Sequence, residues 1–212
     1  SFRLFLAVVR GAGVLDYRFN NLDVLRAERG CLVIANHPSL LDYVLLASVM
    51  NETDCLVKSA LLRNPFVSGV IRAADYLINS EADTLLAASQ QRLAQGDTLL
   101  IFPEGTRTRV GEAMTLQRGA ANIAVRCNSA VRVVVIHCSE RMLDKQSSWY
   151  NVPPNKPVFT VDVRERINIH DFYDASQHEP ALAARQLNRH MQHQLTTGLQ
   201  SLSGTKDASA LS

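Results

Sequence analysis

Short apolar runs alternate along the chain with longer segments in which apolar residues recur at helical spacing. The runs are rich in Val, Ile and Leu and mostly lack polar alternation, which is typical of strands covered on both faces. They predict strands at 31–35, 55–58, 76–78, 98–102, 131–138 and 158–163. The other segments predict helices at 2–14, 40–50, 60–72, 81–95, 116–128 and 179–199. This order favours an α/β fold in which helices flank a central, largely parallel sheet.

Length and composition predict one folded domain. The chain has 212 residues, of which 47% are hydrophobic, so it can bury a sizeable core and disorder is excluded as its main state. Prolines cluster between residues 152 and 157 and predict a loop there, because proline lacks a backbone donor. The final residues are mostly small and polar. We therefore predict a single domain over 1–202 and a flexible tail over 203–212.

Charge and cysteine content narrow the function classes. The 22 Lys and Arg nearly balance the 20 Asp and Glu, so bulk charge does not indicate nucleic-acid binding, and we predict no nucleic-acid partner. No pair of cysteines forms a C-x-x-C motif, and the histidines show no metal-ligand spacing. We expect free thiols in a reducing compartment and no metal site. The cysteines are Cys31, Cys55, Cys127 and Cys138.

The N-terminal segment leaves two interpretations open. No apolar stretch reaches the ~18 uninterrupted residues that a membrane-spanning helix needs. The short apolar run 4–9 lies between Arg3 and Arg10. The predicted helix at 2–14 is either an interfacial helix with basic flanks or a helix packed on the domain.

The first candidate site follows the predicted strand 31–35 directly. Residues 36–42 read Asn, His, Pro, Ser, Leu, Leu, Asp. Ser39 and Asp42 have the spacing of a capped helix start, which is a purely structural interpretation. One helical turn also brings the Asp42 carboxylate back toward the His37 imidazole, and such a pair can orient a general base. Spacing alone favours the structural interpretation, because a His followed five residues later by an Asp is common.

The second candidate site follows the predicted strand 98–102. Residues 102–107 read Phe, Pro, Glu, Gly, Thr, Arg. Glu104 can accept hydrogen bonds from hydroxyl groups, and Arg107 suits bidentate contacts with phosphate or carboxylate. The structural alternative is a surface turn with a local ion pair. Ligands bind outside the carboxyl ends of parallel strands, so the two turns are expected at one edge of the sheet.

In this order, the two motifs resemble those of the glycerophospholipid acyltransferase family, the 1-acylglycerol-3-phosphate acyltransferases and their relatives. The family's N-H-x4-D motif is met by Asn36, His37 and Asp42, and its F-P-E-G-T-R motif by 102–107 without change. Weaker matches are the stretch 58–69, which begins at Lys58, and the segment 117–121, which contains Arg118. The resemblance covers roughly 16–166.

The resemblance implies an O-acyltransferase of lipid biosynthesis. The donor would be an acyl-CoA or acyl-carrier-protein thioester, and the acceptor a lysophospholipid-like hydroxyl compound, lysophosphatidic acid by default. His37 would act as general base and Asp42 would orient it, with no metal and no bound cofactor. The family also implies a membrane surface as partner. The implied substrate-binding residues are Asn36, Lys58, Glu104, Gly105, Thr106, Arg107 and Arg118.

Two departures from the family pattern bear on specificity. The second motif of the family ends in an arginine that is thought to help hold the acceptor's phosphate, and Asn79 stands near that position here. The fourth motif carries prolines in an apolar strand thought to line the donor site, and 130–136 has none.

Three alternatives to acyl transfer onto lysophosphatidic acid therefore stay open. They are a specialised acyltransferase with an unusual acyl or polyene donor or a non-phosphate acceptor, a thioester hydrolase, and a non-catalytic lipid-binding protein. For an acyltransferase we expect the cytoplasmic face of a bacterial inner membrane, with peripheral attachment or an anchor before residue 1.

Overall fold

A computed structural model of the protein describes residues 2–39, 41–50, 53–58, 77–79, 82–105, 113–140, 153–175 and 179–209. The predicted helix at 60–72 lies outside these residues. The described helices are α1 (Phe2–Gly11), α2 (Leu22–Ala27), α3 (Asp42–Val49), α5 (Ala82–Ala94), α6 (Gly119–Arg126) and α7 (Pro180–Ser209). The strands are β1 (Asp16–Asn20), β2 (Leu32–Ala35), β3 (Thr53–Lys58), β4 (Leu77–Asn79), β5 (Thr98–Ile101), β6 (Val131–Cys138) and β7 (Val158–Ile167).

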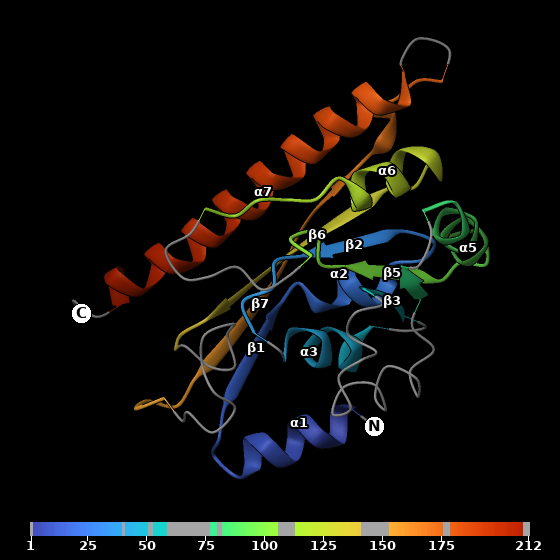
Figure 1. Ribbon diagram of the computed structural model, residues 1–212. Helices are drawn as coiled ribbons and strands as arrows, with labels where there is room; N and C mark the ends of the chain where they lie inside the picture. The colour runs from blue at the N-terminus through green and yellow to red at the C-terminus, as the bar shows by residue number, and fades with distance from the viewer. Residues whose placement is uncertain are drawn as a thin grey trace.

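The described strands form one sheet in the order β1-β7-β6-β2-β5-β3-β4. The strands from β6 to β4 run parallel to one another. β7 pairs antiparallel with β6, and β1 pairs parallel with β7, so these two strands run the opposite way. The prediction of an α/β fold with a largely parallel, helix-flanked sheet is confirmed (Figure 1).

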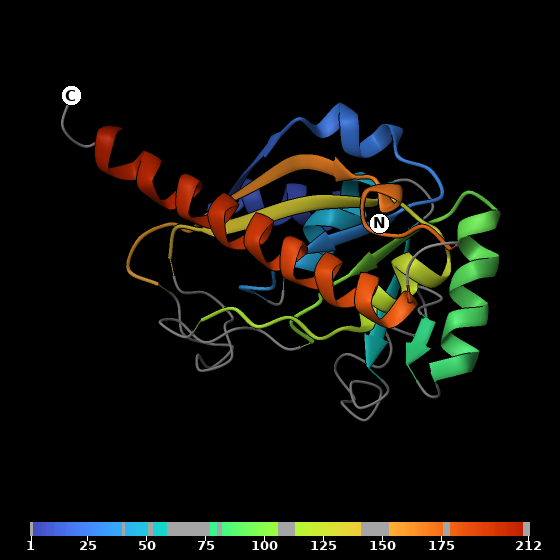
Figure 2. The same cartoon turned by 90° about the horizontal axis from the view of Figure 1, so that it is seen from above.

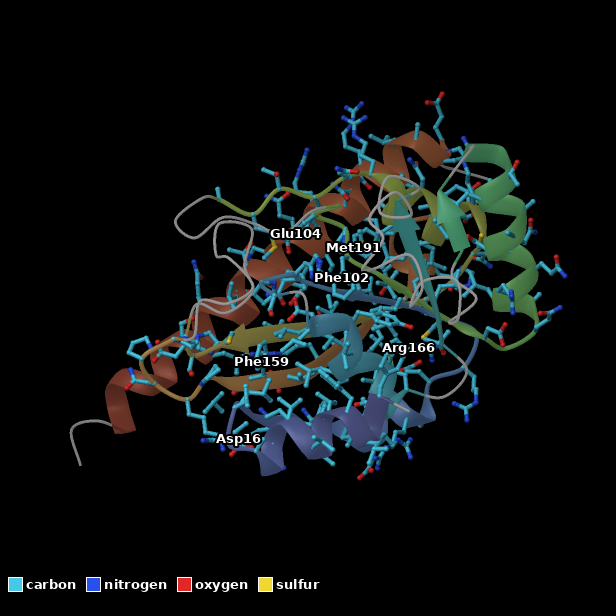
Figure 3. All side chains as sticks on the ribbon, turned by 60° about the horizontal axis from the view of Figure 1, so that its bottom comes forward. Asp16, Phe102, Glu104, Phe159, Arg166 and Met191 are labelled. Carbon is cyan, nitrogen blue, oxygen red and sulfur yellow. The ribbon has the colours of Figure 1, made fainter. Side chains whose placement is uncertain are left out.

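Helices cover both faces of the sheet, and each face has its own apolar core. α5, α6 and α7 lie over one face, and α1, α2 and α3 lie over the other (Figure 1). β2 shows why the strands lack polar alternation: Leu32 and Ile34 enter the first core, and Val33 and Ala35 enter the second. Figure 3 labels one residue of each core, Met191 on α7 and Phe159 on β7.

α7 is the longest of the described helices and lies along β6 and β7 (Figure 2). Leu187, Met191 and Leu195 are fully buried, as their spacing predicts, whereas Leu182 is exposed because it lies on the outer side of the first turn. The helix continues to Ser209, so 203–209 is helical where the sequence predicted a polar tail.

Three elements escaped the sequence prediction: β1, α2 and a short 3₁₀ helix, Ile169–Asp171, after β7. β1 is a short edge strand, Asp-Tyr-Arg-Phe-Asn, in which polar and aromatic residues alternate, unlike the apolar runs of the inner strands. Tyr17 and Phe19 lie edge to face on it, with ring centroids 5.7 Å apart. α2 has six residues and is too short to show helical periodicity.

A buried ionic cluster joins three strands near the edge where β2 and β6 begin. Glu28 is only 7% exposed. It accepts hydrogen bonds from the Arg132 guanidinium and from the Cys31 thiol, and Arg166 lies 3.8 Å away. Arg132 also donates to the Arg164 carbonyl oxygen of β7 at 2.8 Å. The cluster ties β6 to β7 at the edge opposite the two candidate turns, so it supports the scaffold and not the site.

Candidate active site

The two candidate turns lie side by side because β2 and β5 are parallel neighbours. Ile34 pairs with Ile101 in this register, so His37 and Glu104 each lie three residues beyond a matched pair. The carboxyl ends of both strands therefore present their polar residues at the same edge of the sheet. Figure 3 labels Phe102 and Glu104 in the turn that follows β5.

The carboxylate of Asp42 contacts both the His37 ring and the backbone before α3. Its Oδ2 lies 2.9 Å from His37 Nδ1 and accepts a hydrogen bond of 2.7 Å from the Ser39 N–H. The Ser39 hydroxyl in turn accepts from the Leu41 N–H at 3.3 Å. The Asp42 carboxylate thus links the backbone before α3 to the imidazole. The predicted cap by Ser39 does not form at the helix start itself, since the N-cap of α3 is Leu41, which makes no side-chain capping hydrogen bond.

This geometry orients the His37 ring, with Nδ1 toward the Asp42 carboxylate. Oδ2 accepts from a backbone N–H and lies against Nδ1, which is the arrangement of an ionised carboxylate between two donors. A hydrogen bond from Nδ1–H to this carboxylate corresponds to the tautomer in which Nε2 is the unprotonated nitrogen. The Asp42 side chain is fully buried and the His37 side chain is 18% exposed, so the imidazole is accessible from outside while the carboxylate is shielded.

Two residues from the turn after β5 fix the position of His37. Its ring stacks on Phe102, with centroids 4.4 Å apart and planes inclined by 27°. Its backbone N–H donates to Glu104 Oε1 at 2.7 Å. Glu104 is 6% exposed. The sequence motif identified Glu104 as a site residue, but it gave no indication that the carboxylate contacts the histidine backbone.

Asn36 joins β2 to β6. Its side-chain amide donates to the Ile136 carbonyl oxygen and accepts from the Ile136 N–H, both at 2.7 Å. The amide reproduces the pairing of a backbone peptide and extends the β2–β6 ladder beyond Ala35. Asn36 is 2% exposed. The structure gives it a role in holding the strand end, and contact with an acceptor stays a prediction.

The turn after Glu104 requires glycine. Gly105 has a φ of +69° and donates its N–H to the Phe102 carbonyl oxygen at 3.0 Å. A Cβ at this position would lie 2.6 Å from Gln117 Nε2, at the end of a flexible side chain that can move aside, so the positive φ is the main reason for glycine here. The Gln117 N–H also donates to the Pro103 carbonyl oxygen at 2.8 Å, which ties the start of α6 to the turn.

The remaining predicted site residues are placed only in part. Arg118 is exposed and directly follows Gln117 at the start of α6, close in sequence to the residue packed on Gly105. Lys58 is the last residue of β3, on the strand next to β5. Thr106 and Arg107 lie outside the described residues. Their roles stay predictions, as do those of the residues described above.

Burial disfavours the thiolate form of two of the described cysteines. Burial, together with the Glu28 carboxylate, raises the pKa of the Cys31 thiol to about 12, which keeps it protonated at neutral pH. Burial also raises the pKa of the Cys127 thiol. Cys31, Cys127 and Cys138 are free thiols. The motifs predicted one acid–base pair, His37 with Asp42. The described residues bring that pair together.

The chain belongs to the Acyltransferase family. The sequence model of that family, which is described as Acyltransferase, matches residues 16–139, more than half of the chain. The matched region contains both turns of the candidate site, from His37 to Gly105. The recognition of an acyltransferase family from its two motifs is therefore confirmed at the level of the family.

Among its relatives are 1-acyl-sn-glycerol-3-phosphate acyltransferases from bacteria and animals. The protein of Helicobacter pylori is 30% identical over 112 residues, covering 50% of this chain and 47% of its own length. That of Pseudomonas aeruginosa is 26% identical over 157 residues, covering 71% of this chain and 60% of its own length. The chain thus spans between about half and two thirds of the length of such relatives.

A solved structure shares the fold. The crystal structure of the 1-acyl-sn-glycerophosphate (LPA) acyltransferase PlsC from Thermotoga maritima superposes with a TM-score of 0.66 at 19% identity. The match covers 95% of this chain and 78% of that one. The likeness therefore extends beyond the region matched by the family model.

Proposed function

We propose that the protein transfers an acyl chain from a thioester donor to a hydroxyl of a lysophospholipid-like acceptor. The observation that carries the proposal is the 2.9 Å contact between His37 Nδ1 and the buried Asp42 carboxylate, at the sheet edge where ligands bind in open α/β folds. The names of the relatives and of the structural neighbour support lysophosphatidic acid as the first acceptor to test.

The proposed reaction is direct transfer. Nε2 of His37 takes the proton from the acceptor hydroxyl, and the acceptor oxygen attacks the thioester carbonyl carbon. The carbon–sulfur bond then breaks, and the departing sulfur takes the proton from the imidazolium, so the products are an ester and a free thiol. Asp42 stabilises the imidazolium while it exists. The raised pKa values of the Cys31 and Cys127 thiols favour this route over a covalent acyl-cysteine.

The acceptor's head group would be held by the turn after β5 and its neighbours. Gly105 turns the chain sharply at the edge beside His37, and the following residues of the motif, Thr106 and Arg107, would bind phosphate or carboxylate oxygens. Lys58 and Arg118 would add positive charge from the neighbouring strand and from the start of α6. We propose no metal or bound cofactor in this reaction.

The test measures thiol release from an acyl-CoA and from an acyl-carrier protein, with and without lysophosphatidic acid, and follows the lipid by mass spectrometry. We expect release that depends on the lysolipid, with a mass gain of one acyl chain, and we expect no such gain with His37→Ala. Release that is independent of the lysolipid would instead indicate a hydrolase. No release with either donor would contradict the default substrates and direct attention to Asn79 and the proline-free β6.

We further propose that the protein works at a membrane surface through the outer face of α1. Leu4, Phe5 and Val8 are 66%, 47% and 61% exposed and lie on one side of the helix. The opposite side packs on α3, where Phe2 meets Tyr43 edge to face at 5.6 Å and Arg3 donates to the Ser48 carbonyl oxygen. α3 begins with Asp42, the partner of the proposed base His37. The apolar side of α1 therefore belongs to the same helical layer as Asp42. Within the described part of the chain, no helix combines the length and apolarity needed to span a bilayer.

Replacing Leu4, Phe5 and Val8 together by serine should weaken binding to phosphatidylglycerol vesicles. Burial of one such side chain contributes about 1.5 kcal/mol, roughly tenfold in affinity, so the triple variant should lose at least about a hundredfold. Co-sedimentation with vesicles measures the loss. Leu182→Ser is the matched control, because Leu182 is 46% exposed on α7 in the opposite layer. An equal loss in the control, or none in the triple variant, would exclude α1 as the docking face.

A further inference from the structure

We infer that Glu104 is a positioning residue that holds the backbone of His37, and not a ligand of the acceptor hydroxyl. The inference rests on the proposed function in one respect, because its kinetic test measures acyl transfer. Its structural basis is the hydrogen bond of 2.7 Å from the His37 N–H to Glu104 Oε1, made by a carboxylate that is 6% exposed. An acceptor ligand would be expected to present its oxygens to the open side of the site.

The ladder between β2 and β5 ends just before this contact. Leu32, Val33 and Ile34 pair with β5, and the last pair is Ile34 with Ile101. Beyond it Pro103 cannot donate a backbone hydrogen bond, and the chain turns back, with Gly105 N–H on the Phe102 carbonyl oxygen. The Glu104 carboxylate thus supplies an acceptor to the His37 N–H where β5 no longer provides a paired strand.

A matching device lies on the other side of β2. The Asn36 amide pairs with both backbone groups of Ile136 on β6 at 2.7 Å. Consecutive residues at the end of β2 are therefore fixed to both neighbouring strands by side chains, Asn36 to β6 and His37 to Glu104 beyond β5. Residues 100 and 67 positions apart in sequence are joined by these contacts.

Together these contacts leave the imidazole little freedom. The backbone of His37 is held by Glu104, one ring face lies on Phe102, and Nδ1 lies on Asp42. The His37 side chain keeps 18% of its surface exposed, so part of the ring stays accessible to a substrate. A base held this way needs no reordering before it takes a proton, whereas a displacement of about 1 Å can cost about a hundredfold in rate.

Three variants separate positioning from acceptor binding. Glu104→Gln keeps an oxygen at the same reach but removes the charge. Glu104→Asp keeps the charge but is one methylene too short, and Glu104→Ala removes both. Positioning predicts that Ala and Asp lower kcat about 10- to 100-fold with little change in the acceptor's KM, and that Gln recovers most of the lost kcat. Acceptor binding predicts that Gln and Ala both raise the acceptor's KM instead.

A readout that needs no activity keeps this inference distinct from the proposed function. In spectra of the protein labelled with ¹⁵N-histidine, the ring signals of His37 are assigned by their loss in His37→Ala. We expect these signals to stay near their wild-type positions in Glu104→Gln and to shift in Glu104→Asp. Wild-type-like signals in Glu104→Asp, or a kcat for Asp above that for Gln, would overturn the inference. Absence of acyl transfer in the wild type would contradict the proposed function and leave the spectroscopic test intact.

Discussion

His37→Ala is expected to lower kcat by about 10²–10⁴, because it removes the group that takes the proton from the acceptor hydroxyl. The fold should survive, since the His37 side chain is partly exposed and the strand end is held independently by the Asn36 amide on Ile136. The initial rate of thiol release at saturating lysophosphatidic acid measures the effect.

The matched control is His170→Ala. His170 is an exposed histidine on the short 3₁₀ helix after β7, away from the edge where β2 and β5 end. We expect wild-type rates from this variant. Comparable rates in His37→Ala and the wild type would remove His37 from the chemistry, and equal losses in both variants would point to a nonspecific effect on the protein.

Asp42→Asn is expected to lower kcat by a similar factor, about 10²–10⁴, with the acceptor's KM nearly unchanged. The fully buried carboxylate now accepts at one oxygen from Ser39 N–H and lies against His37 Nδ1. An amide has no charge to stabilise the imidazolium, and its NH₂ group can face Nδ1 and place the proton on Nε2, which disables the base. Steady-state kinetics with varied acceptor measure both parameters.

The double variant His37→Ala with Asp42→Asn distinguishes orientation from a separate role. If Asp42 acts through His37, the double variant should be no slower than His37→Ala alone, because residues that act as one unit are strongly non-additive. If the double variant instead lost kcat by the product of the two single losses, Asp42 would have a role that does not pass through His37. Asp97→Asn is the control for loss of a carboxylate, since Asp97 pairs with Arg92 at 3.4 Å just before β5, at the other end of that strand.

The candidate site shows where sequence reasoning succeeded. The pattern from Ser39 to Asp42 encodes a local helix start, and a contact over three residues depends little on the rest of the fold. The same turn carries the carboxylate to His37, five residues away. The sequence placed both turns directly after predicted strands, and the alternation of strands with helices predicted that both turns lie at the same edge of a largely parallel sheet.

Other features could not be predicted because they depend on strand order. Nothing in the sequence places β2 between β5 and β6, yet that placement brings Glu104 and Ile136 to either side of residues 36 and 37. The stacking of Phe102 on His37 has the same origin. β1 escaped prediction because an edge strand is only half buried and lacks a continuous apolar run.

The sequence by itself determined the fold class and the Acyltransferase family, and it brought Asp42 within one helical turn of His37, because apolar patterning and contacts within one turn are encoded by neighbouring residues. Only the tertiary structure decided that the amide of Asn36 and the carboxylate of Glu104 hold the end of the strand that carries His37. It also decided that Leu4, Phe5 and Val8 face outward while Leu6 is buried against the domain. The physical reason is that a side chain's partner across a sheet or between layers is set by strand order and packing, which spacing along the chain does not specify.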